Sequence, residues 1–135
     1  QHLINYRCGT GHSVSFVGNV HEGPHALNGR NTTVFRPGMI VTDEPGVYEG
    51  GVVGIRIENE LECVHKATNQ YGTFLAFEPV TFVPIDTSPI LPGVLNADQL
   101  AWLNEYHRQV YAALAPHLTE AERNWLAGKC AAIGC

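Results

Sequence analysis

The sequence has few positive charges, no long apolar run and no regular cysteine spacing. Its 135 residues include eight Lys and Arg against thirteen Asp and Glu, for a formal net charge of −5. The basic residues are scattered, and binding of nucleic-acid phosphates needs clustered Lys and Arg, so nucleic acid is excluded as the main partner. No apolar stretch approaches the roughly 20 residues that span a bilayer, and we therefore expect no membrane partner.

Cysteine usage predicts reduced thiols. The four cysteines lie at positions 8, 63, 130 and 135 and form no CxxC pair. We expect a cytoplasmic protein, because stable disulfides are rare in that compartment. Cys130 and Cys135 are close enough in sequence to pair, but two free thiols fit the pattern better.

Methionine is scarce as well. Met39 is the only one, and the chain begins with Gln1, so we expect a processed chain or a piece of a longer one. The length fits one domain with a sizeable core. The composition, 44% hydrophobic and 16% charged, is typical of a soluble globular protein.

Before residue 95 the sequence predicts short strands. Turn signals made of Gly and Pro separate three β-like runs, at 39–42, 52–64 and 73–83. In the middle run, apolar residues at every second position alternate with Gly54, Arg56 and Glu58. This period of two is expected of a half-buried strand, with Arg56 and Glu58 on the same polar face.

After residue 95 the pattern is helical. Asn96 and Thr119 are each followed three residues later by Gln or Glu, the capping-box signature of a helix start. The first helix should end at Pro116, and the second should run from about 120 to 132 with Gly134 closing it. One apolar stripe marks the first helix and consists of Leu100, Leu103, Tyr106, Val110 and Leu114. The sequence therefore predicts an α+β chain, a curved antiparallel sheet followed by C-terminal helices.

Four polar residues are left unexplained by this local structure. His12 lies in Gly-Thr-Gly-His, His21 precedes a Gly-Pro turn, Glu44 follows an apolar run, and Glu58 lies on a polar strand face. Imidazole and carboxylate groups are ligands for divalent ions. Each residue alone has another interpretation: a loop histidine is usually solvated, Glu44 could be a turn residue, and Glu58 could pair with Arg56. Spacing by itself predicts only a candidate metal site.

Three motifs in a fixed order say more: GTGHSVSFVGNVHEGP at 9–24, PGMIVTDEPGVYEGG at 37–51 and GIRIENELECV at 54–64. Together they resemble the C-terminal part of the M24 metallopeptidases, and among these the Xaa-Pro aminopeptidases, or aminopeptidases P. The tail, with FEPVTFVPID at 77–86 and LNADQLAWLNEYHRQVY at 95–111, is similar to the C-terminal extension of the cytosolic-type enzymes.

The resemblance implies a fold and a cofactor. The family has the pita-bread (creatinase/aminopeptidase) fold, of which residues 1–94 would form the C-terminal half of the catalytic domain. Residues 95–135 would be a helical extension packed on it. The family site holds two divalent ions, usually Mn, with Co, Zn or Fe as alternatives, bound by two Asp, one His and two Glu.

By motif, the resemblance also assigns residues. His12, Glu44 and Glu58 match the metal ligands, and Glu44 is expected to act as the catalytic proton acceptor as well. His21 matches a catalytic histidine that contacts substrate or stabilises the developing tetrahedral intermediate. Arg56 would orient Glu58.

Two features depart from the family pattern. The two Asp ligands should precede His12, and none of the eleven residues before it is Asp. The chain can therefore supply three of five ligands, and we expect it to be inactive alone. In addition, Cys8 stands where the family has a substrate-contacting His. Cys8 could be tolerated there, could weaken catalysis, or could simply pack as a small apolar residue.

The implied activity of the parent enzyme is hydrolysis of the N-terminal Xaa-Pro bond. The expected partners are peptides with proline at the second position and the remaining N-terminal part of the same enzyme. Alternatives are a prolidase-like or creatinase-like hydrolase, and a non-catalytic peptidase-like module that binds peptides or proteins. The tail favours a homodimer, but its apolar stripe fits packing on its own domain equally well.

Overall fold

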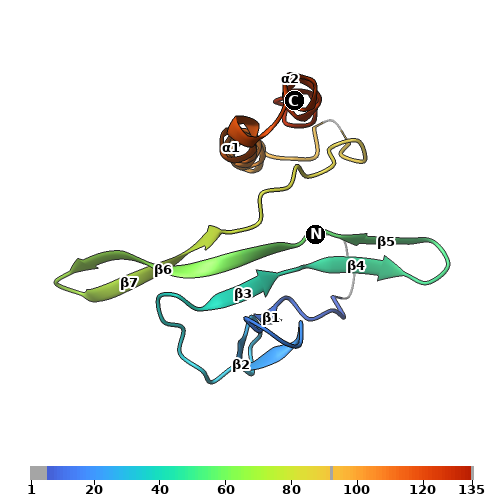
Figure 1. Cartoon of the computed structure of the whole chain (residues 1–135). Coiled ribbons are helices and arrows are strands. Elements are labelled where there is room, and N and C mark those ends of the chain that lie inside the picture. The colour runs from blue at the N-terminus through green and yellow to red at the C-terminus, as the bar shows by residue number, and fades with distance from the viewer. Residues whose placement is uncertain (1–5, 92, 135) are drawn as a thin grey trace. The chain divides into compact units, whose positions relative to one another are not determined.

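The structure is a computed structural model and describes residues 6–91 and 93–134. The chain divides into two compact units, one ending at Thr81 and the other beginning at Phe82. The first unit is built from strands and the second contains the helices (Figure 1). Residues 82–94, which composition groups with the strands, thus cluster with the helices.

In the described part of the first unit, seven strands form two antiparallel sheets. The larger sheet has the order β2-β1-β3-β6-β7, and a separate ribbon pairs β4 with β5. The bounds are β1 His12–Ser13, β2 Glu22–Ala26, β3 Ile40–Asp43, β4 Gly46–Glu49, β5 Val53–Arg56, β6 Asn59–Asn69 and β7 Gly72–Pro79. The predicted antiparallel sheet and C-terminal helices are confirmed.

The single strand predicted at 52–64 is wrong, because the structure divides it into two. β5 ends at Arg56 and β6 begins at Asn59, with Ile57 and Glu58 between them. β5 pairs with β4, whereas β6 pairs with β3 and β7. The chain therefore crosses from one sheet to the other at 57–58, and Glu58 lies at this junction and not on a strand face.

The apolar side chains of β5 do not reach the half-buried state that their spacing predicts. Val53 and Ile55, and Ile57 just after the strand, keep 46%, 52% and 48% of their surface exposed. A two-stranded ribbon cannot bury a face by itself, since burial needs a further layer packed on it. In the described part of the chain these residues form an exposed apolar face.

The buried centre of the first unit lies where β1, β3 and β6 meet. Val41 and Cys63 are fully buried, and the polar Thr42 and Ser13 retain 1% and 3% exposure. Buried hydroxyl groups need hydrogen-bond partners, and the partners of Thr42 and Ser13 lie in the candidate site described below. Beyond this centre, β6 and β7 continue together as a long hairpin (Figure 1).

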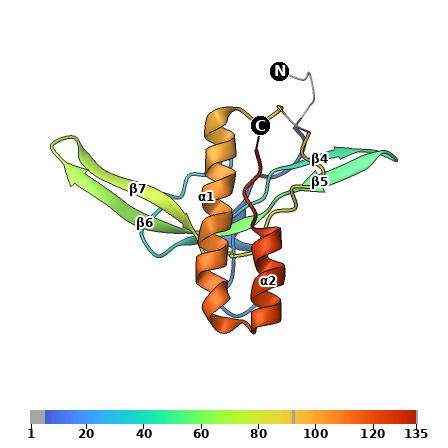
Figure 2. The same cartoon turned by 90° about the horizontal axis from the view of Figure 1, so that it is seen from above.

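The second unit contains α1 (Ala97–Leu114), a 3₁₀ turn (Ala115–His117) and α2 (Glu120–Lys129). Figure 2 shows the two helices side by side. Both predicted capping boxes are confirmed: the Asn96 side chain accepts from the Gln99 backbone N–H, and the Thr119 side chain accepts from Glu122. None of the described helices is long and apolar enough to span a membrane.

The predicted end of α2 at 132, closed by Gly134, is wrong, because the helix stops at Lys129 with Cys130 as its C-cap. The Asn104 side chain explains the stop. Its amide donates to the Ile133 carbonyl and accepts from the Ile133 N–H, both at 3.0 Å. These two bonds hold the backbone after α2 on α1 in a non-helical conformation. Cys130 is a free thiol whose pKa burial raises, and its suggested partner Cys135 lies outside the described residues.

The predicted apolar stripe of α1 forms the core of the helical unit. Tyr106 and Val110 pack with Leu126 of α2 in one buried cluster, and Leu103 is also buried. The sequence pattern does not single out His107, which is fully buried beside this stripe. Its Nε2 accepts the Ile85 backbone N–H at 3.1 Å, which ties the segment before α1 to the helix.

We expect acid to weaken the helical unit through His107. Burial lowers the pKa of His107, and the Ile85 N–H occupies Nε2, which must stay unprotonated to accept it. The unfolded state then binds the proton more readily, so stability is complete above about pH 6.5 and falls as the pH drops below it, by at most about 1.4 kcal/mol per pH unit. Trp102 and Trp125 are the only tryptophans and both lie in this unit, so urea unfolding followed by their fluorescence at pH 7 and pH 5 measures the effect.

A matched pair of variants separates His107 from other groups. His107→Gln keeps an acceptor for Ile85 without titrating and should flatten the pH dependence, whereas His117→Gln at an exposed histidine should leave it unchanged. Hydrogen bonds lower the pKa values of Asp86, Glu105 and Glu122, so these carboxyl groups titrate below this window. Equal pH dependence in wild type and His107→Gln would contradict the assignment.

Candidate functional site

The Gly-Thr-Gly-His segment brings His12 against the strand that precedes Glu44. The His12 backbone N–H donates to Thr42 Oγ1 at 3.0 Å, and Ser13 pairs with Val41 between β1 and β3. Gly11 is required for this approach, because a Cβ at Gly11 would lie 1.8 Å from the Thr42 carbonyl oxygen. The close backbone approach that glycines in this motif allow is thus found at Gly11, against the Thr42 carbonyl group.

Glu44 directly follows β3, and its carboxylate is held from three sides. Its backbone N–H donates to the Thr10 carbonyl at 2.6 Å. One carboxylate oxygen, Oε1, accepts from Thr42 Oγ1 at 3.0 Å and lies 2.9 Å from His12 Nε2. The other, Oε2, lies 2.7 Å from Arg56 Nη1. The two predicted ligands His12 and Glu44 are thus brought together.

The His12 ring lies between two acceptors. Its Nδ1 is 2.9 Å from the Ser13 carbonyl oxygen, which can only accept, so Nδ1 carries a proton. On a neutral ring Nε2 then carries a lone pair and no proton, and this lone pair faces the Glu44 carboxylate. A positive ion, either a proton or a metal, is needed between these two atoms for the contact to be favourable.

This pair fits a divalent metal ion. His12 Nε2 and Glu44 Oε1 lie 2.9 Å apart, and imidazole nitrogen and carboxylate oxygen are both groups that bind divalent ions. Both side chains keep part of their surface accessible, 20% for His12 and 16% for Glu44. A nitrogen and a carboxylate oxygen also form a donor set that Mn, Co, Zn and Fe accept.

His21 lies next to His12, as the motif predicts. The two rings are 4.2 Å apart between centroids and tilted by 37°. The Ser13 hydroxyl donates to the Glu22 carbonyl, which anchors the segment that carries His21 to β1. His21 is otherwise exposed, so its imidazole can reach a molecule bound in front of His12.

Arg56 contacts Glu44 and Tyr48. Its Nη1 donates to the Glu44 carboxylate and to the Glu44 carbonyl, and its Nε donates to the Tyr48 hydroxyl at 2.8 Å. The hydrogen bond with Tyr48 raises the pKa of Arg56, and the charge of Glu44 acts in the same direction. The Arg56 guanidinium therefore stays charged beside Glu44. None of these hydrogen bonds of Arg56 goes to Glu58. The predicted role of Arg56 in orienting Glu58 therefore stays a prediction.

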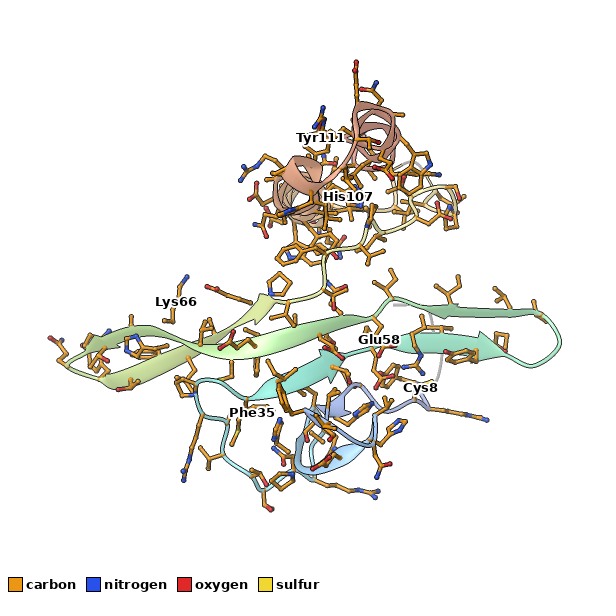
Figure 3. The ribbon with its side chains drawn as sticks, viewed as in Figure 1. Cys8, Phe35, Glu58, Lys66, His107 and Tyr111 are labelled. Carbon is orange, nitrogen blue, oxygen red and sulfur yellow. The ribbon has the colours of Figure 1, made fainter. Side chains whose placement is uncertain are left out.

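Glu58 and Cys8 are the remaining predicted site residues. Figure 3 shows both toward the β4–β5 side of the first unit. Glu58 is exposed, and Cys8 is a half-buried free thiol. Within residues 6–91 and 93–134, no group of three His, Cys, Asp or Glu side chains could hold a metal ion. The ligand role of Glu58 and the substrate-binding role of Cys8 stay predictions.

Sequence reasoning missed two residues of this arrangement, Thr42 and Tyr48. Both belong to the second motif, TDEPGVY, and the signal was available for Thr42: it lies two residues before Glu44, so the two side chains share one side of an extended chain. Tyr48 offered no such signal, because its bond to Arg56 depends on the pairing of β4 with β5.

The chain is similar to known metallopeptidases. The sequence profile of metallopeptidase family M24 matches residues 2–65, and that of the C-terminal region of peptidase M24 matches residues 73–133. Aminopeptidase P2 of Arabidopsis thaliana is 43% identical over 91% of this chain, which covers 18% of that protein. Aminopeptidase P1 of Lotus japonicus is 41% identical over 91% of the chain and 20% of its own length.

A solved structure matches as well. It is the X-prolyl aminopeptidase of Caenorhabditis elegans, described as a cytosolic enzyme with a di-nuclear active site. The TM-score is 0.82 at 39% identity, over 93% of this chain and 21% of that one. The chain thus spans about a fifth of the length of these relatives.

Proposed function

The chain belongs to metallopeptidase family M24, and on that premise we propose that it is the C-terminal part of an Xaa-Pro aminopeptidase. The parent enzyme would hydrolyse the bond between an N-terminal residue and a following proline. The observation that carries the proposal is the His12–Glu44 pair, whose Nε2 and Oε1 atoms lie 2.9 Å apart. This contact is favourable only when a cation lies between the two atoms.

When bound, two divalent metal ions supply an activated water molecule at neutral pH and polarise the scissile carbonyl group. Manganese is our first choice, with Co, Zn or Fe as alternatives, because His and carboxylate ligands accept all four. His12 and Glu44 would hold the ions from this chain together with Glu58. The C. elegans relative has a di-nuclear site, which supports the same number here.

The remaining chemistry is assigned to the side chains around this pair. Glu44 takes the proton of the attacking water and passes it toward the leaving proline nitrogen, a task suited to a carboxylate beside the reacting atoms. Arg56 keeps this carboxylate oriented through Oε2. His21, exposed and next to His12, donates a hydrogen bond to the substrate carbonyl oxygen as negative charge develops on it. Cys8 lines the same region.

The isolated chain would lack activity. The resemblance implies five ligands, and none of the residues that precede His12 is the Asp that the family places there. We propose that the two Asp come from the remaining N-terminal part of the parent enzyme, which works in the cytoplasm as does its C. elegans relative. Pairing of two parent chains stays a prediction.

Peptide hydrolysis by the full-length parent tests the proposal. Incubated with Mn²⁺, the parent should release the first residue from an Xaa-Pro-Yaa tripeptide, and should leave the matched Xaa-Ala-Yaa peptide largely intact. Cleavage confined to Xaa-Pro dipeptides would favour a prolidase-like enzyme, and turnover of creatine a creatinase-like one. A folded, Mn²⁺-loaded parent that binds the tripeptide without cleaving it would be a peptide-binding module. Each of these three results contradicts the proposed activity.

A further inference from the structure

Thr42 contacts both His12 and Glu44, the two residues of the candidate metal site. It lies in β3 with 1% exposure, and its hydroxyl oxygen has two partners. The His12 backbone N–H donates to Oγ1 at 3.0 Å, and Oγ1 lies 3.0 Å from Glu44 Oε1. A backbone N–H can only donate, so the single hydroxyl proton is free to point at the carboxylate. Both hydrogen bonds are therefore satisfied at the same time.

We propose that Thr42 is a positioning residue that sets the relative placement of His12 Nε2 and Glu44 Oε1. This inference rests on the proposed function, because it concerns the metal site assigned there. Thr42 does not reach the reacting atoms itself. It acts through its two partners, one of which carries the imidazole and the other the carboxylate.

Strand pairing between β1 and β3 does not by itself set the placement of the His12 and Glu44 side chains relative to each other, although β1 also pairs with β2 at both of its residues. β1 has only two residues, and its pairing with β3 consists of Ser13 with Val41. Glu44 lies beyond the end of β3, where no strand pairing fixes its side chain. The Thr42 hydroxyl takes the place of a strand bond for His12 and fixes Oε1, while Arg56 fixes Oε2. With both oxygens held, the plane of the carboxylate is set.

Threonine suits this place better than serine or valine. Its branched Cβ restricts χ1 in a strand, so the hydroxyl direction is defined before any ligand binds. Serine keeps the hydroxyl with more rotational freedom. Valine keeps the shape and loses both hydrogen bonds, which leaves the Glu44 carboxylate free to turn away from His12. Comparing Thr, Ser and Val at position 42 therefore separates the effect of the hydroxyl hydrogen bonds from the effect of side-chain packing.

The test uses the full-length parent enzyme with Thr42→Val, Thr42→Ser and the control Thr73→Val, an exposed threonine in β7. Mn²⁺ binding is measured by calorimetry, and kcat and KM are measured on the tripeptide. Thr42→Val should weaken Mn²⁺ binding about 10- to 100-fold and lower kcat more than it changes KM. Thr42→Ser should recover most of the affinity, and Thr73→Val should match wild type.

The outcomes separate this inference from the proposed function. Folded Thr42→Val with wild-type Mn²⁺ affinity overturns the inference, even if peptide hydrolysis by the parent is confirmed. Loss of the fold in metal-free Thr42→Val, seen by circular dichroism, also overturns it, because the hydroxyl would then serve strand pairing alone. If Thr42→Val weakens Mn²⁺ binding but the wild-type parent does not cleave Xaa-Pro peptides, the positioning role of Thr42 is supported and the proposed function is contradicted.

Discussion

Replacing Glu44 by glutamine in the full-length parent is expected to lower kcat/KM for Xaa-Pro cleavage by about 10³-fold or more. Glutamine keeps the size of the side chain and removes both its negative charge and its ability to take a proton. Among the carboxylates that the structure describes, Glu44 is the one that faces His12 Nε2 and Arg56 at once, at 2.9 and 2.7 Å. On the proposed function, the change would therefore weaken a metal ligand and remove the proton acceptor together.

The measurement is steady-state release of the first residue from an Xaa-Pro-Yaa peptide at saturating Mn²⁺. Glu49→Gln provides the matched control, since Glu49 is an exposed carboxylate of the neighbouring strand β4. It should retain wild-type kinetics, and His12→Ala should lose activity as Glu44→Gln does. Glu44→Gln with kcat/KM within a few-fold of wild type would remove Glu44 from the catalytic machinery.

The second large effect is expected on stability, when Gly11 is replaced by alanine and a single methyl group is added. Gly11→Ala places a Cβ 1.8 Å from the Thr42 carbonyl oxygen and 2.8 Å from its carbonyl carbon, and these are backbone atoms that cannot turn aside. β1 and β3 must then separate, which breaks the His12–Thr42 bond and moves His12 from Glu44. We expect the first unit to lose more than about 3 kcal/mol of stability, beyond the usual cost of overpacking.

Urea unfolding of the 135-residue chain, followed by far-UV circular dichroism, measures this loss. Gly9→Ala is the control within the same motif, because nothing lies within 4 Å of a Cβ at Gly9. It should stay within about 0.5 kcal/mol of wild type, as is usual for open surface positions. Equal stability of the Gly11 and Gly9 variants would show that β1 does not pack on β3 at this point.

The sequence predicts the elements that depend on local patterns. The capping residues Asn96 and Thr119, and the stripe through Tyr106 and Val110, follow from spacing within one helix. Their success reflects physics that acts over a few residues, where side chains meet backbone groups of the same turn. The end of α2 was missed for the opposite reason, because it depends on the distant Asn104.

The candidate site is predictable only in part. Motif order identifies His12, His21 and Glu44, and the structure places them together. The partners of these residues are only partly contained in one motif: the Thr42–Glu44 contact joins positions two residues apart, but the bonds of Thr42 to His12 and of Arg56 to Glu44 and Tyr48 join different strands or segments, which a linear pattern does not contain. The same reason explains the strand wrongly predicted through Glu58, since a crossing between sheets interrupts neither polarity nor period.

The central claim, that this chain supplies one half of a two-metal site, is tested most directly by counting bound metal. Equilibrium dialysis against Mn²⁺, with metal analysis of the protein, should give two ions per full-length parent chain. The count should fall in His12→Ala and Glu44→Ala, and the 135-residue chain alone should bind Mn²⁺ weakly and leave an Xaa-Pro-Yaa peptide uncleaved. Two tightly bound ions on the isolated chain, or peptide hydrolysis by it, would contradict the account.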